Sequence, residues 1–213
     1  EVQQEALVRR LPQFHKFLEA ASFSQGSVLN VQTIARDVGI DRKTAESYFQ
    51  LLEDLLLGVR LEVFRRKAKR EIIQHPKFYF FDTGVFRTLR PKGPLDLDSE
   101  IDGAALETLV FQELRAVIEM HRIPLQIYFW KTRSKLEVDF VLYGETGLFA
   151  FEVTREGRFR SDQLKSLRAF KEDYPMAQAY LLYGGDESLE VDGINIRPVR
   201  TTLPVLGIML RDP

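Results

Sequence analysis

The stretch that decides the fold of the second half of the chain is Leu136-Glu-Val-Asp-Phe-Val-Leu-Tyr-Gly-Glu-Thr-Gly-Leu-Phe-Ala-Phe-Glu-Val-Thr154. Two runs of alternating apolar and polar residues flank Gly144-Glu-Thr-Gly147, which is a strong β-hairpin signal. Centring the turn between Glu145 and Thr146 pairs Val138 with Val153, Phe140 with Phe151 and Leu142 with Phe149. One side of the ribbon is then apolar, and a shift of one residue would expose it.

The same register places Asp139 directly opposite Glu152 on the other side of the ribbon. Like charges at facing positions destabilise a strand pair, so something must offset their repulsion. A divalent cation is one answer, because magnesium takes carboxylate oxygens together with water and substrate phosphate as ligands. The other is a solvent-screened face, or a neighbouring arginine or lysine. Without either, one of the two carboxyl groups is expected to have a raised pKa.

A third acidic residue strengthens the case for a site. Residues 104–120 are predicted to be helical, and Glu107 falls inside the apolar stripe of that helix, near Phe111 and Leu114. A carboxylate on the core-facing side of a helix is costly unless it is paired or coordinated. The sequence therefore predicts that Glu107, Asp139 and Glu152 converge.

This order of residues resembles the PD-(D/E)xK nuclease fold. More closely, the chain resembles the C-terminal part of predicted bacterial and archaeal AAA+ superfamily ATPases, in which a winged helix and a nuclease-like domain of unknown function follow the ATPase core. The stretches that carry the likeness are residues 48–58, 77–85, 106–114 and 128–141. The resemblance implies that Glu107, Asp139 and Glu152 occupy the metal-ligand positions, with magnesium or manganese as the cofactor.

The chain departs from this pattern in two places. Thr154 stands where the nucleases carry a lysine that orients water or stabilises charge on the phosphate, and a hydroxyl cannot supply that charge. Lys131, Arg133 and Lys135 are the nearby cations that could replace it. The chain also has no Gly-x-x-x-x-Gly-Lys-Ser/Thr phosphate loop. We therefore expect ATP to bind only through an ATPase core upstream, which is missing from this chain.

The N-terminal part has the layout of a helix-turn-helix. Residues 31–37 and 41–56 are the two predicted helices, Gly39 lies in the turn between them, and residues 58–64 could form a wing. Arg42, Lys43 and Thr44 begin the second helix, where a reader of the DNA major groove carries its contacts. The alternative is that this module packs against a partner domain.

The densest basic run of the chain follows, with five cations in six residues: Arg65, Arg66, Lys67, Lys69 and Arg70. Such a run can neutralise phosphates without reading sequence, although many such runs are solvated linkers. It also suggests a boundary between a winged-helix region at residues 1–65 and a nuclease-like domain at residues 70–213.

Composition limits the possible functions. The 213 residues include 30 basic and 31 acidic side chains, so any nucleic-acid contact must come from a local patch. With no cysteine there is no disulfide framework or thiolate site. No apolar run approaches the ~20 residues of a membrane span, so we expect a cytoplasmic protein.

The sequence as a whole predicts an α/β (α+β) chain, a winged helix followed by a mixed sheet flanked by helices. The leading hypothesis for its function is a recognition or effector module of an AAA+-type ATPase that binds DNA or a partner, with a degenerate nuclease site. An active magnesium-dependent DNase and a purely structural interaction domain are the alternatives.

Overall fold

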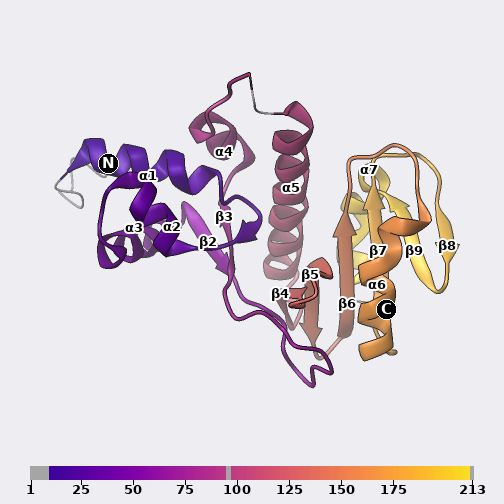
Figure 1. Cartoon of the computed structure of the whole chain (residues 1–213). Coiled ribbons are helices and arrows are strands. Elements are labelled where there is room, and N and C mark those ends of the chain that lie inside the picture. The colour runs from indigo at the N-terminus through magenta and orange to yellow at the C-terminus, as the bar shows by residue number, and fades with distance from the viewer. Residues whose placement is uncertain (1–9, 95–96, 212–213) are drawn as a thin grey trace. The chain divides into compact units, whose positions relative to one another are not determined.

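The computed structural model describes residues 10–94 and 97–211 and shows a mixed α+β fold, which confirms the predicted fold class (Figure 1). It holds a three-stranded sheet of order β1-β3-β2 and a six-stranded sheet of order β4-β5-β6-β7-β9-β8. The chain divides into two compact units. Residues up to Arg60 and His75–Ile101 form the first unit, and Leu61–Gln74 with the residues from Asp102 onward form the second. The sequence-based boundaries, 1–65 and 70–213, differ from these units at residues 61–65 and 75–101 and stay a prediction.

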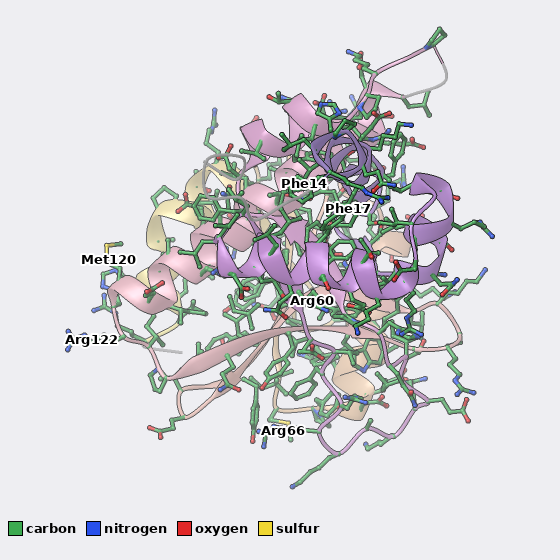
Figure 2. The ribbon with its side chains drawn as sticks, turned by 90° about the vertical axis from the view of Figure 1, so that its left-hand side faces the viewer. Phe14, Phe17, Arg60, Arg66, Met120 and Arg122 are labelled. Atoms are coloured by element: carbon green, nitrogen blue, oxygen red, sulfur yellow. The ribbon has the colours of Figure 1, made fainter. Side chains whose placement is uncertain are left out.

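The first unit has the element order of a winged helix. Its elements are α1 (Leu11–Ser22), β1 (Ser27–Val28), α2 (Val31–Val38), α3 (Arg42–Asp54), β2 (Gly58–Leu61, whose last residue belongs to the second unit), β3 (Lys77–Phe80) and α4 (Thr83–Leu89). A chain of aromatic rings forms its core. The ring of Phe17 lies 4.8 Å from that of Phe49, which lies 4.9 Å from that of Phe78. Phe14 and Phe17 project from α1 (Figure 2).

Local sequence signals fix the starts and ends of these helices. Asn30 caps α2 by accepting from the Thr33 N–H, and Asp82 caps α4 by accepting from the Val85 N–H. Gly39 ends α2 in the left-handed conformation with φ of 75°, which a side chain would disfavour. The two helices of the predicted helix-turn-helix are therefore present, with bounds within two residues of those expected.

The second unit is built around the six-stranded sheet. Its elements are α5 (Asp98–Met120, whose first turn belongs to the first unit), β4 (Leu125–Lys131), β5 (Glu137–Gly144), β6 (Gly147–Val153), the 3₁₀ helix η1 (Ser161–Leu164), α6 (Lys165–Asp173), β7 (Gln178–Tyr183), β8 (Leu189–Val191), β9 (Ile194–Pro198), α7 (Val199–Thr202), the 3₁₀ helix η2 (Leu203–Val205) and α8 (Leu206–Met209). Strands β4, β5 and β6 are antiparallel, whereas β6, β7 and β9 are parallel. Helix α6 covers one face of this sheet (Figure 1).

The hairpin register agrees with the sequence over most of its length. Phe140 pairs with Phe151, Leu142 with Phe149 and Gly144 with Gly147. The predicted pairing of Val138 with Val153 is not formed, because the backbone ladder of β5 and β6 stops at Phe140 and Phe151. The pairing of β5 with β4 shifts at the same place, which turns Val138 toward the core under α6.

Candidate functional site

Asp139 lies where the ladder between β5 and β6 stops. Its Oδ2 atom accepts the backbone N–H of Val153 at 3.0 Å, so the carboxylate supplies the bond that the next carbonyl of the ladder would have made. Asp139 is half-buried and stands beside the strand that carries Glu152. The structure thus places two of the predicted acidic residues on neighbouring strands and assigns one of them a structural bond.

Glu107 lies on helix α5 and Glu152 lies on strand β6 of the second unit. Glu152 aligns with Leu181 on the neighbouring parallel strand β7, and Leu181 belongs to the core under α6. Glu107 lies one helical turn before Phe111 on α5, and the Phe111 ring stacks on Phe140 at 5.6 Å.

Glu107, Asp139 and Glu152 are the predicted metal ligands of the chain. Among residues 10–94 and 97–211, no three or more histidine, aspartate or glutamate side chains gather in a way that could hold a metal ion. Binding of magnesium or manganese by Glu107, Asp139 and Glu152 stays a prediction.

Thr154 occupies the position of the nuclease lysine and takes part in the turn after β6. Its backbone N–H donates to the Leu182 carbonyl at 2.8 Å, and its Oγ1 accepts the Glu156 N–H at 3.3 Å. The next residue, Arg155, forms an ion pair with Asp102 at 3.4 Å. Position 154 therefore stabilises the backbone here and brings no positive charge.

The three cations that could replace the lysine are arranged differently from one another. The Lys131 ammonium forms an ion pair with Glu137, its partner across β4 and β5, in a half-buried setting. The exposed Arg133 pairs with Glu71 at 3.2 Å. Lys135 lies in the turn before β5 with φ of 67°. Lys131 is thus the half-buried cation of the three, on the strand next to Asp139, and its charge is balanced by Glu137.

The start of α3 carries the cations predicted to contact DNA. Arg42 and Lys43 are exposed in its first turn. Thr44 is committed to the helix cap, since its N–H and hydroxyl donate to the Asp41 carboxylate at 2.9 and 2.6 Å. The Thr44 hydroxyl, and then its N–H, lower the pKa of Asp41, so the cap is anionic at neutral pH. Arg42 and Lys43 therefore remain as contact candidates, while Thr44 serves the fold.

Arg60 of β2 balances the acidic side of α3 (Figure 2). Its guanidinium pairs with Glu53 at 2.6 Å and with Glu46 at 3.2 Å, and the hydrogen bond that it donates to Glu53 raises the pKa of Arg60. A hollow of about 430 Å³ lies beside this cluster and includes Asn30, Arg42 and His75 in its lining. The charges on this side of the helix thus largely cancel, and the exposed positive charge is concentrated at its first turn.

The basic run lies in the second unit, and part of it is held by α6. Arg70 bonds to both oxygens of Asp173, at 3.2 and 3.1 Å, and to Glu172 at 2.6 Å. Lys69 donates to the Glu172 carbonyl at 3.2 Å. The acceptors for these two cations lie about 100 residues away, and no local sequence signal indicated them.

The other members of the run lie differently. The Arg66 guanidinium lies 4.9 Å from the centre of the Tyr143 ring. Arg65 and Lys67 are exposed. Only part of the predicted phosphate-binding run is therefore open to a ligand.

Residues 102–202 match a family model described as a domain of unknown function (DUF4143). Residues 1–99 match a second domain of unknown function (DUF8612). Each match covers a little under half of the chain.

Similar curated proteins include the uncharacterized proteins Mb2031c of Mycobacterium bovis and Rv2008c of Mycobacterium tuberculosis. Each is 24% identical over 168 residues, which are 76% of this chain and 36% of the relative. The chain thus spans about a third of the length of these relatives. The crystal structure of protein VC1899 from Vibrio cholerae aligns with a TM-score of 0.39 and 13% identity, over 94% of this chain and 50% of that one. This likeness is too low to carry an argument.

Proposed function

We propose that the chain is a recognition module that binds DNA through the first turn of α3 and carries a nuclease-like second unit with a degenerate site. The observation that carries the proposal is the exposure of Arg42 and Lys43 at the start of the second helix of a winged-helix arrangement. In helix-turn-helix proteins this end of the second helix approaches the base edges and phosphates.

The charges of the first unit also set the expected strength of binding. Two exposed cations at the start of α3 correspond to about two phosphate contacts, which predicts a salt slope near −2 for the logarithm of the association constant. Binding this weak falls in the range of non-specific interactions, with Kd of about 10⁻⁴ to 10⁻⁶ M. The module would therefore rely on a larger assembly for tight binding.

The state of position 154 supports a nuclease-like unit without cleavage. A lysine there would bring a positive charge to the reacting phosphate, whereas Thr154 is neutral and its hydroxyl accepts a backbone N–H. The competing function is a metal-dependent DNase that uses Glu107, Asp139 and Glu152. The placement of Asp139 beside the strand of Glu152 favours that alternative.

The wider setting of the proposal is an AAA+-type ATPase. Its support is the resemblance stated above, together with relatives of which this chain covers 36%. In that setting an ATPase core outside this chain binds ATP, and the two units of this chain bring that core to DNA. No helix within residues 10–94 and 97–211 has the length and apolarity to cross a membrane. A cytoplasmic setting is part of the proposal.

Fluorescence anisotropy with a labelled DNA duplex tests the DNA proposal. Arg42→Ala/Lys43→Ala should abolish most of the binding at low salt and reduce the salt slope toward zero. The matched control is Lys16→Ala/Lys165→Ala, which removes two exposed cations from other surfaces and should leave the affinity within about twofold. Binding that is absent, or unchanged in Arg42→Ala/Lys43→Ala, refutes the proposal and favours a structural interaction domain.

Incubation of the full chain with supercoiled plasmid and magnesium or manganese separates the two nuclease readings. The proposal expects intact plasmid. Nicking that disappears in Asp139→Asn would establish the DNase alternative. Isothermal titration with manganese tests the metal site by itself, and heat of binding that Glu152→Gln removes would show that the predicted ligands act together.

A further inference from the structure

A hollow of about 530 Å³ lies in the second unit beside the turn of the β5–β6 hairpin. Its main lining residues are Phe64, Arg66, Lys67, Tyr143, Tyr174 and Met176. The volume falls within the ~300–1,000 Å³ range of sites that bind small molecules or single side chains. DNA binding by the first turn of α3 and the predicted acidic site do not use this hollow, whose lining includes Arg66 and Lys67 of the basic run.

The side of the hollow that carries Arg66 and Lys67 is held in place by contacts within the second unit. The Tyr174 hydroxyl donates to the Arg66 carbonyl at 2.8 Å, and the Phe64 and Tyr174 rings lie 5.4 Å apart. Arg70, four residues further along, is bonded to Asp173. A wall held at several points loses little conformational entropy when a ligand binds, which favours affinity.

The charge of the lining selects an anion. The Arg66 guanidinium lies over the Tyr143 ring at 4.9 Å, an arrangement that leaves the N–H groups at its edge free to meet a carboxylate. Lys67 is exposed beside it. The residues that line the hollow, all within the described part of the chain, include these two cations and no aspartate or glutamate. Figure 2 shows Arg66 at the lower margin of the ribbon.

The apolar part of the lining selects a bulky hydrophobic group. Met176 is 72% exposed and Tyr143 is 37% exposed, whereas Phe64 and Leu148 are buried behind them. Methionine at a surface adapts to the shape of a bound side chain. Stacking of a nucleic-acid base is disfavoured, because Arg66 covers one face of Tyr143, and Phe64 and Tyr174 are buried.

From this combination we infer that the hollow binds an acidic peptide segment of a partner protein. An aromatic or large aliphatic side chain of the peptide enters between Tyr143 and Met176. Carboxylates on either side of it pair with Arg66 and Lys67. This inference is independent of DNA binding by the first unit, since every residue it uses belongs to the second unit.

Fluorescence anisotropy with labelled Glu-Glu-X-Glu-Glu peptides tests the inference, where X is Phe, Trp, Tyr, Leu or Met. At least one of these peptides should bind the full chain more tightly than the peptide with alanine at X. The same peptide with lysine in place of glutamate should not bind. Arg66→Ala/Lys67→Ala should weaken binding about tenfold or more, since each removes a charge-assisted contact.

Two further variants keep the test decisive. Met176→Glu places a negative charge at an exposed position of the hollow and should abolish binding without unfolding the protein. Arg65→Ala/Lys165→Ala removes two exposed cations that do not line the hollow and should change affinity by less than about twofold. The inference is overturned if none of the five peptides exceeds the alanine peptide, or if Met176→Glu and Arg66→Ala/Lys67→Ala bind as the wild type does. A labelled single-stranded oligonucleotide that binds in their place and loses affinity in Arg66→Ala/Lys67→Ala would also overturn it.

Discussion

Replacement of Arg70 by alanine should destabilise the second unit far more than a surface ion pair would suggest. Arg70 bonds to both oxygens of Asp173, whose side chain is only 4% exposed, whereas the Arg70 side chain is 33% exposed. Removing one partner of a buried pair costs ~3–5 kcal/mol, because the remaining charge is left desolvated. Since a third of Arg70 already meets water, we lower this figure to about 2–3 kcal/mol for Arg70→Ala.

Urea unfolding followed by tryptophan fluorescence measures this cost. Trp130 is the single tryptophan of the chain, is fully buried, and lies 5.4 Å from the Phe170 ring of α6, three residues before Asp173. With a slope of about 2 kcal/mol per molar urea, the expected loss lowers the midpoint by ~1 M or more.

Neighbouring variants show whether the buried acid is the cause. Glu172 is 71% exposed, so Glu172→Ala should cost less than about 1 kcal/mol. Asp173→Ala should cost less than Arg70→Ala, because the freed guanidinium can turn to water. The double variant should then be more stable than Arg70→Ala alone. If Arg70→Ala lowers the midpoint no more than Glu172→Ala does, the reasoning from burial is refuted.

Three other predictions concern the cap of α3, a buried tyrosine and a close backbone contact. The pKa of Asp41 is lowered by the Thr44 hydroxyl and N–H, so its stabilising effect is present above the unfolded-state pKa and is lost as the pH falls through the folded-state value. Asp41→Ala should therefore speed hydrogen exchange of the Thr44 amide at neutral pH and have no such effect in strong acid, and equal rates at neutral pH would contradict the cap. Burial, and then the nearby Asp173, raise the pKa of Tyr174 to about 12, so the second unit should lose stability as the pH rises from 10 to 12. Tyr174→Phe should reduce this pH dependence in urea titrations read by Trp130, leaving the part due to Tyr180, whose pKa is also raised by burial. It should cost ~1 kcal/mol at neutral pH for the lost bond to the Arg66 carbonyl, and an unchanged slope in the variant would assign the pH dependence to another group. A Cβ at Gly144 would lie 1.8 Å from the Pro124 carbonyl oxygen, so Gly144→Ala should force the hairpin away from that loop at a cost above ~2 kcal/mol. Gly103→Ala, in open space on α5, is its control and should be neutral or stabilising in the same assay.

Local patterns in the sequence were enough to predict the hairpin and the helix-turn-helix. The apolar alternation of residues 140–151 fixes the register of β5 and β6, because any other alignment would expose Phe140 and Phe149. Asp41 and Gly39 mark the start of α3 and the end of α2 by their own hydrogen bonding and backbone freedom. These features depend on residues close together in the chain.

Features that depend on contacts between residues far apart in the chain could not be predicted from the sequence. The turn of Val138 into the core follows from the pairing of β5 with β4, which shifts between Tyr128 and Trp130. The bond from Arg70 to Asp173 joins residues about 100 positions apart. For the candidate site, the sequence placed Asp139 beside the strand of Glu152, but a group of three acids able to hold a metal is not found in the described residues. Convergence of that kind depends on how a helix rests on a sheet, which periodicity alone does not set.

The path of the chain between β2 and β3 has a practical consequence for anyone who would produce the winged helix alone. Residues 61–74 belong to the second unit, and β3 follows them as the middle strand of the β1-β3-β2 sheet. A polypeptide that stops at residue 65 would lack this strand, leaving β1 and β2 without the neighbour that joins them. Conversely, a single protease cut within residues 61–74 would divide the polypeptide without separating the units, because each resulting piece retains parts of both. The backbone thus crosses from one unit to the other at residues 61, 75 and 102, and neither unit can be isolated by a single truncation.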